Sequence, residues 1–147
     1  MNNKVKILIS DCLLGTNCKY NGKNNLNLDV LHLKEKYQLI PVCPEVFGGL
    51  SIPRKTSEIK NGKVIHNDMT DVTKEFIEGA MKTLNIAKEN SCKIAILKAK
   101  SPSCGFGEVY DCTFTSTLIN GNGIAADLLY KNGIVVLNET NFHEYLK

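Results

Sequence analysis

Long hydrophobic runs are missing from this sequence, and none approaches the roughly 20 apolar residues of a membrane-spanning helix, so we expect no membrane partner. Dense Lys/Arg blocks with interleaved aromatic residues are also missing. The net charge is only +3, which argues against nucleic acid as a partner. Residues 1–4 lead into a strand-like segment without the apolar stretch of a secretory signal, so we expect a cytoplasmic protein.

Several cofactor motifs are absent as well. The three histidines, His32, His66 and His143, do not have the pairwise spacing of a zinc site. Gly121-Asn122-Gly123 lacks the Lys-Ser/Thr ending of a phosphate-binding loop, and Gly105-Phe106-Gly107 is too short for a dinucleotide fingerprint. These absences disfavour a histidine-rich zinc enzyme and a nucleotide-cofactor enzyme.

Short apolar segments alternate with segments of helical periodicity. Because such alternation requires crossover connections, it predicts an α/β protein with a mostly parallel sheet that is covered on both faces. Asn61-Gly62 predicts a tight turn between two further strands, a small β-hairpin insertion. With no repeat, low-complexity tract or linker, we expect one domain over residues 1–147. The expected strands are 4–10, 39–42, 93–97 and 134–137, the hairpin strands 56–59 and 63–66, and the helices 26–36, 70–90 and 125–131.

What the sequence does contain is six cysteines. Disulfide frameworks belong mainly to secreted chains, so in a cytoplasmic protein we interpret clustered loop cysteines as metal ligands or nucleophiles. Cys12, Cys43 and Cys104 each follow one of the first three predicted strands of the sheet. The carboxyl ends of parallel strands share one edge, so these thiols could form a three-thiolate socket for a soft metal centre. Three small buried hydrophobic residues are the alternative interpretation.

The neighbours of these cysteines favour a site. Cys43-Pro44-Glu45 places a carboxylate beside one thiol, and Ser101-Pro102-Ser103-Cys104-Gly105 surrounds another with hydroxyls. Gly48-Gly49 would expose backbone amides, and Pro53-Arg54 would offer a cation to an anion. A solvated Glu45 and a plain loop hydroxyl at Ser101 remain the alternatives.

The other cysteines have different surroundings. Cys92 lies between a predicted helix and a strand, and Cys112 lies in a β-like run over residues 108–119, so both are expected to pack in the interior. Cys18 shares the first loop with Cys12 and could replace or assist it.

Three motifs in this order resemble the thiouracil desulfurase (TudS) family, long catalogued as a domain of unknown function. The similarity covers nearly the whole chain. The motifs are Ser10-Asp11-Cys12-Leu13-Leu14-Gly15 with Tyr20-Asn21-Gly22, Cys43-Pro44-Glu45-Val46-Phe47-Gly48-Gly49-Leu50 with Pro53-Arg54, and Lys98-Ala99-Lys100-Ser101-Pro102-Ser103-Cys104-Gly105.

This resemblance implies a Rossmann-like three-layer domain that holds a [4Fe–4S] cluster with one open iron. It implies a non-redox reaction that converts thiolated uracil, as the base, nucleoside or nucleotide, to uracil and sulfide. Asp11 departs from the small residue usual in the family, and its carboxylate would lower the cluster's potential or weaken its assembly. The implied cluster and metal ligands are Cys12, Cys43 and Cys104, the acid–base pair is Glu45 and Ser101, and the substrate-binding residues are Gly48, Gly49, Arg54 and Ser103.

Two other functions fit the same residues. One is a non-enzymatic iron–sulfur or sulfide-binding module that stores or passes on sulfide or metal. The other is an α/β domain that zinc stabilises. All three interpretations predict bound metal, and only the enzyme consumes a thiolated pyrimidine.

Overall fold

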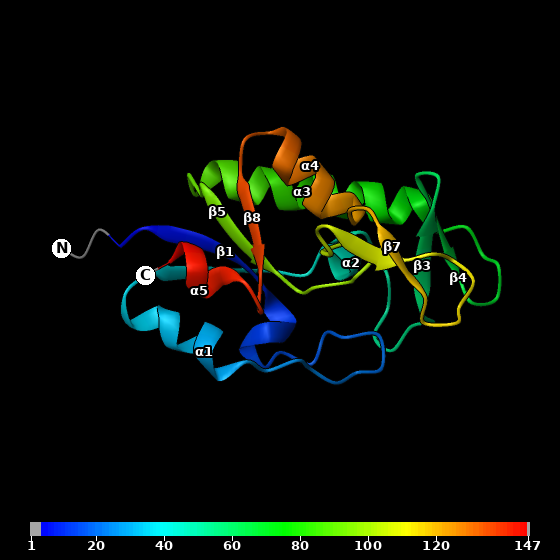
Figure 1. The fold of residues 1–147 in the computed structure, drawn as a ribbon, viewed down its shortest axis with the longest axis horizontal. Coiled ribbons are helices and arrows are strands. Elements are labelled where there is room, and N and C mark those ends of the chain that lie inside the picture. The colour runs from blue at the N-terminus through cyan, green and yellow to red at the C-terminus, as the bar shows by residue number, and fades with distance from the viewer. Residues whose placement is uncertain (1–3, 147) are drawn as a thin grey trace.

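A computed structural model describes residues 4–146 of the protein (Figure 1). Strands and helices alternate along most of the chain, as the sequence predicts. The elements are β1 (Lys6–Ser10), η1 (Asp11–Leu14), α1 (Leu28–Leu31), η2 (His32–Glu35), β2 (Gln38–Val42), α2 (Pro44–Phe47), β3 (Ser57–Lys60), β4 (Lys63–His66), α3 (Thr73–Glu89), β5 (Ile94–Leu97), β6 (Glu108–Tyr110), β7 (Leu118–Asn120), α4 (Ile124–Lys131), β8 (Val135–Asn138) and α5 (Phe142–Tyr145).

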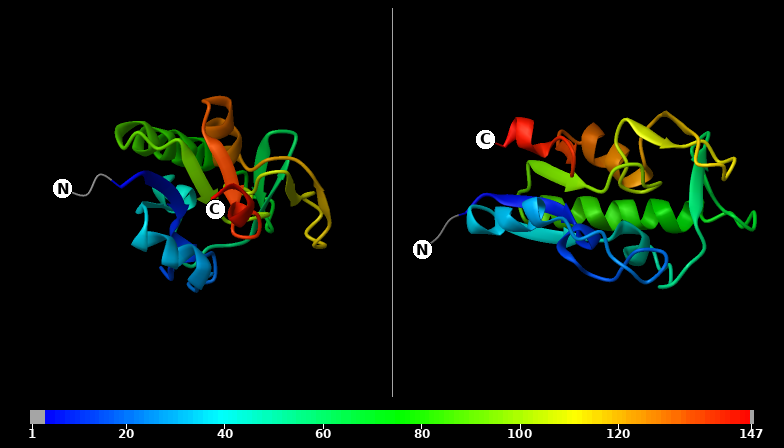
Figure 2. Two further views of the ribbon diagram at one scale, coloured as in Figure 1. Left: turned by 60° about the vertical axis from the view of Figure 1, so that its left-hand side comes forward. Right: turned by 60° about the horizontal axis from the view of Figure 1, so that its bottom comes forward.

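The centre of the molecule is a parallel sheet with the strand order β2-β1-β5-β8. Helices α3 and α4 cover one face, and α1 and α5 lie on the other (Figures 1 and 2). The predicted α/β class, the parallel sheet and its two covered faces are therefore confirmed. Within residues 4–146, no helix has the length and apolar character needed to cross a membrane.

Strand β1 shows why the sheet needs both layers. Leu8 packs into a core with the inner side chains of α3 and α4, whereas Ile7 and Ile9 pack into a second core with Val30 of α1 and Phe142 of α5. Side chains alternate between the faces of a strand, so an uninterrupted apolar run is buried only when both faces are covered.

Two hairpins extend from the sheet, on the right of Figure 1. Strands β3 and β4 form the predicted hairpin, in which Asn61 and Gly62 take the positive φ angles of 52° and 77° that a tight hairpin turn requires. Strands β6 and β7 form the second one. The expected continuous run over residues 108–119 is wrong, because a loop separates these strands and Cys112 lies on it with a φ of 72°. Cys112 is half-buried there and does not belong to the core.

Helix α2 is short, and its position depends on two glycines. A Cβ atom added to Gly79 of α3 would lie 1.8 Å from the carbonyl oxygen of Pro44 in α2. A Cβ atom added to Gly48 would lie 1.9 Å from the Glu75 carbonyl oxygen of α3. The two helix backbones are therefore in direct contact, and this contact fixes the segment that carries Cys43 and Glu45.

Candidate active site and metal centre

A cavity of about 620 Å³ lies beyond the carboxyl ends of β1, β2 and β5. Four thiols line it, from Cys12, Cys18, Cys43 and Cys104. The first two come from the segment after β1, the third follows β2 and the fourth follows β5. The fold thus brings together the three predicted thiols and adds a fourth. Cys92, by contrast, packs in the core under α3 and α4, as predicted.

Local structure fixes each of the three predicted thiols. Cys12 lies on η1, which ends at Gly15 with a left-handed φ of 95°. Cys43 is the residue from which helix α2 starts, and Pro44 occupies the first helical position, where its fixed φ favours helix initiation. Cys104 lies in the loop after β5, where its backbone N–H donates to Ser101 Oγ at 3.1 Å, and it is 5% exposed.

Each of these sulfur atoms has polar neighbours. The Asn25 side-chain amide donates a hydrogen bond to Cys12 Sγ at 3.4 Å. Cys104 Sγ lies 3.6 Å from Ser103 Oγ, and Cys43 Sγ lies 3.8 Å from the backbone oxygen of Cys18, which is an acceptor. A donor such as the Asn25 amide stabilises a thiolate, and around iron–sulfur clusters such donors influence the reduction potential.

Burial and contact between the thiols shift their pKa values. Burial raises the pKa of Cys12, and it raises the pKa of Cys104 to about 12. A hydrogen bond from the Cys18 thiol lowers the pKa of Cys43 to about 7, and the same bond raises the pKa of Cys18. Cys43 is therefore the thiol of the pair that ionises first.

The donor set fits a sulfur-ligated iron centre. Thiolates are the ligands of iron–sulfur clusters, and metal binding releases the protons that burial otherwise retains. Across residues 4–146, no three Cys, His, Asp or Glu side chains are grouped so that they could hold a single metal ion. Among the residues described, the cavity lining contains no histidine. Among the possible ligands in the lining, the thiols are the ones whose soft sulfur suits an iron–sulfur cluster.

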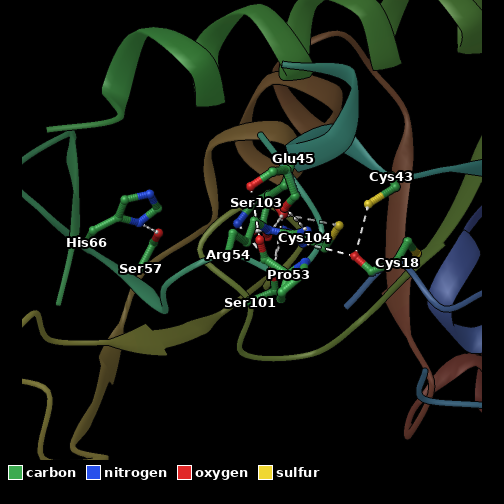
Figure 3. Close-up of polar contacts among 11 residues, drawn as sticks. Cys18, Cys43, Glu45, Pro53, Arg54, Ser57, His66, Ser101, Ser103 and Cys104 are labelled. Atoms are coloured by element: carbon green, nitrogen blue, oxygen red, sulfur yellow. Dashed lines mark hydrogen bonds and ion pairs between the residues drawn. The ribbon is translucent and has the colours of Figure 1, made fainter. Parts of the chain in front are cut away.

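A chain of polar groups lies next to the thiols (Figure 3). Arg54 Nε donates to Glu45 Oε1 at 3.0 Å, with the two side chains only 5% and 15% exposed. Ser103 Oγ donates to Glu45 Oε2 at 2.9 Å, and Ser103 Oγ lies 3.0 Å from Ser101 Oγ. Ser101 Oγ also accepts from the backbone N–H groups of Ser103 and Cys104, each at 3.1 Å. The carboxylate and the two hydroxyls thus form one connected array.

Three of the four expected substrate-binding residues have other surroundings in the structure. In the part of the chain that the structure describes, Gly48 and Gly49 do not line the cavity, and Gly48 instead allows the close approach of α2 and α3. Arg54 does line it, but its side chain already donates to Glu45, to the Ser51 oxygen at 3.3 Å and to the Cys18 oxygen at 3.0 Å. Arg54 therefore holds Glu45 and the first loop in place.

Sequence reasoning missed several residues of the cavity. Ser10 accepts a hydrogen bond from the Lys98 backbone N–H at 2.9 Å and also contacts the Cys104 thiol. Lys98 forms an ion pair with Glu139 at 2.8 Å, which joins the loops after β5 and β8. Asp11, expected to act on the neighbouring thiol, accepts from Thr16 Oγ1 at 2.7 Å. Of these residues, Ser10 could have been predicted to line the site, because it lies at the end of a buried strand.

Taken together, a parallel α/β sheet and a cavity in which thiols adjoin a carboxylate–hydroxyl array define a metal-dependent α/β enzyme of the class that builds its active site at strand ends. The sequence model of the 2-thiouracil desulfurase family matches residues 7–141. The chain belongs to this family, which confirms the resemblance inferred from its motifs.

Two further comparisons agree with this assignment. A solved structure of a [4Fe–4S]-dependent thiouracil desulfidase, TudS, superposes with a TM-score of 0.88 and 36% sequence identity, over 96% of this chain and 95% of that one. The uncharacterised protein YbbK of Bacillus subtilis (strain 168) is 38% identical over 150 residues, which cover 95% of this chain and 99% of YbbK.

Proposed function

We propose that the protein is an iron–sulfur-dependent enzyme that removes sulfur from a thiolated uracil and releases it as sulfide. One observation carries the proposal: three strand-end thiols line the same cavity as a carboxylate linked to two hydroxyls. Membership of the 2-thiouracil desulfurase family and similarity to a [4Fe–4S]-dependent thiouracil desulfidase support it.

Cys12, Cys43 and Cys104 are the proposed ligands of a [4Fe–4S] cluster. Three protein thiolates leave one iron open, as catalytic metal sites require. When bound, the cluster supplies a Lewis acid that polarises a soft thiocarbonyl sulfur. The protein's own contribution is to hold the three thiols at one edge of the sheet and to keep them deprotonated while the metal is bound.

The polar array provides the acid–base chemistry. Glu45 accepts the proton of an attacking water, with Ser101 as the hydroxyl that relays it, and the water oxygen adds to the ring carbon. The carbon–sulfur bond then breaks and the sulfur leaves with both bonding electrons. It takes up the proton held by Glu45 and, as the new carbonyl forms, the second proton of the water. The sum is thiouracil plus water giving uracil plus hydrogen sulfide. No electron acceptor is needed, so the proposed reaction does not imply an NAD or flavin partner.

The test is anaerobic reconstitution of the protein with iron and sulfide, removal of unbound sulfide, and incubation with 2-thiouracil and 4-thiouracil. We expect loss of thiouracil absorbance with an equal amount of sulfide released. Cys43→Ala protein, treated in the same way, is the matched control and should do neither.

The competing functions give different outcomes in the same experiment. A storage or transfer module for iron–sulfur or sulfide would bind iron and leave thiouracil unchanged. A zinc-stabilised domain would retain zinc after anaerobic purification and would develop no iron–sulfur absorbance. Either result would replace the enzyme proposal.

A further inference from the structure

Ser103 lies between the two groups proposed for acid–base catalysis. Its hydroxyl donates to Glu45 Oε2 at 2.9 Å and lies 3.0 Å from Ser101 Oγ. Figure 3 shows the three side chains side by side, at the cavity that the thiols line. Among the described residues, no hydrogen bond joins Glu45 directly to Ser101, so Ser103 is the connection between them.

The direction of these hydrogen bonds follows from the number of protons. The Glu45 carboxylate, paired with Arg54 through its other oxygen, can only accept, so the single hydroxyl proton of Ser103 is donated to it. Ser103 Oγ is then left as an acceptor toward Ser101. The proton of Ser101 therefore points to Ser103, and the two hydroxyls are aligned in series toward the carboxylate.

Ser103 is held too firmly to be a mobile substrate contact. It is 2% exposed, and its backbone oxygen accepts from the Ala126 N–H of α4 at 3.0 Å. A Cβ atom added to Gly123 would lie 2.6 Å from the Ser103 carbonyl, so this backbone packs directly against the start of α4. A rigid hydroxyl that is already bonded on both sides suits proton transfer, which requires groups in fixed hydrogen-bonding contact.

We infer that Ser103 is the relay between Ser101 and Glu45 in the proposed desulfuration, on which this inference rests. As Ser101 takes up a proton from the attacking water, its own proton passes to Ser103, and the proton of Ser103 passes to Glu45 Oε2. One proton is moved in total and no electrons are transferred. The same transfers run backwards when the departing sulfur is protonated. Ser103 is thus a positioning residue that acts through its neighbours.

The alternative role for Ser103 is support of the metal centre, because its hydroxyl also lies 3.6 Å from Cys104 Sγ. The two roles predict different measurements. Loss of a relay lowers kcat and leaves KM, the cluster absorbance and the reduction potential unchanged. Loss of a hydrogen bond to a ligand sulfur shifts the potential.

The experiment compares reconstituted wild type with Ser103→Ala, Ser103→Thr, Ser101→Ala and the Ser101→Ala/Ser103→Ala double variant. We expect Ser103→Ala to lower kcat by about 10²-fold or more with KM and potential unchanged. Ser103→Thr, which keeps the hydroxyl, should recover most of that loss. The double variant should be no slower than Ser101→Ala alone. If both hydroxyls belong to one proton path, removal of either already interrupts it, and removal of the second has no further effect.

Three outcomes would overturn the inference: an unchanged kcat in Ser103→Ala, a shift of potential that accompanies the loss, or multiplicative effects in the double variant. If Ser103→Thr does not fold, the comparison of the double variant with Ser101→Ala still tests the relay. If wild type itself leaves thiouracil intact, the proposed function fails as well. An active wild type with an unaffected Ser103→Ala refutes the relay alone.

Discussion

Replacing Arg54 tests the polar array most directly. Arg54 and Glu45 are 3.0 Å apart, and their side chains are 5% and 15% exposed, so this is a largely buried ion pair. Arg54→Met removes the cation and leaves the carboxylate in place without its partner. Removing one member of a buried pair costs about 3–5 kcal/mol, because the remaining charge stays desolvated. For a chain of this size that corresponds to a fall in Tm of about 6–20 °C.

The assay is thermal unfolding of the metal-free protein under reductant, which makes the result independent of cluster loading. Lys55→Met is the matched control, because Lys55 is the next residue and pairs with Asp68 at the surface, where ion pairs stabilise little. The Glu45→Gln/Arg54→Met double variant removes both charges. It should be more stable than the sum of the single losses by about 1–3 kcal/mol.

The reasoning would be refuted if Arg54→Met unfolded at the same temperature as Lys55→Met, or if the two substitutions at Glu45 and Arg54 were strictly additive. Either result would mean that the carboxylate does not depend on the guanidinium. A normal Tm combined with lost turnover would instead place Arg54 on the substrate.

Three further predictions concern the ligands, the base and the helix contact. Glu45→Gln should keep the cluster absorbance and lower turnover by about 10²–10⁴-fold, and wild-type turnover in a steady-state assay would remove Glu45 from the mechanism. Cys43→Ala should lose most of the iron that wild type binds after anaerobic reconstitution, as measured by metal analysis. Cys92→Ala, a change in the core, should retain the iron. Equal iron in the two variants would exclude Cys43 as a ligand. Gly79→Ala should destabilise the protein by about 1–3 kcal/mol in chemical denaturation, because its added methyl group meets the α2 backbone, and the exposed Glu78→Ala on the same helix should have little effect.

The regular elements could be predicted because their signals are local. The apolar runs of β1 and β5, the helical period of α3 and the Asn61-Gly62 turn each lie within a short window of sequence. The loop around Cys112 was not predicted, because its left-handed residues are not glycines and its backbone depends on the distant Glu58, which accepts the Cys112 N–H at 2.9 Å. Such a contact has no trace in the neighbouring sequence.

The candidate site also has one part that the sequence predicts and another part that it does not. That Cys12, Cys43 and Cys104 line one cavity could be predicted, because strand order and the shared edge of a parallel sheet follow from the alternation of elements. The partner of Arg54 and the position of Ser103 between Glu45 and Ser101 could not. They depend on side-chain directions in loops whose conformations the packed core selects.

Thiols that lie 92 positions apart in sequence, from Cys12 to Cys104, come together only after β1, β2 and β5 have paired. In a chain still emerging from the ribosome, the third thiol has yet to be synthesised when the first two are already available. With Cys12, Cys43 and Cys104 as the proposed ligands, a partly made or partly unfolded chain offers iron an incomplete set. On this proposal, the metal is acquired late, after the sheet is complete.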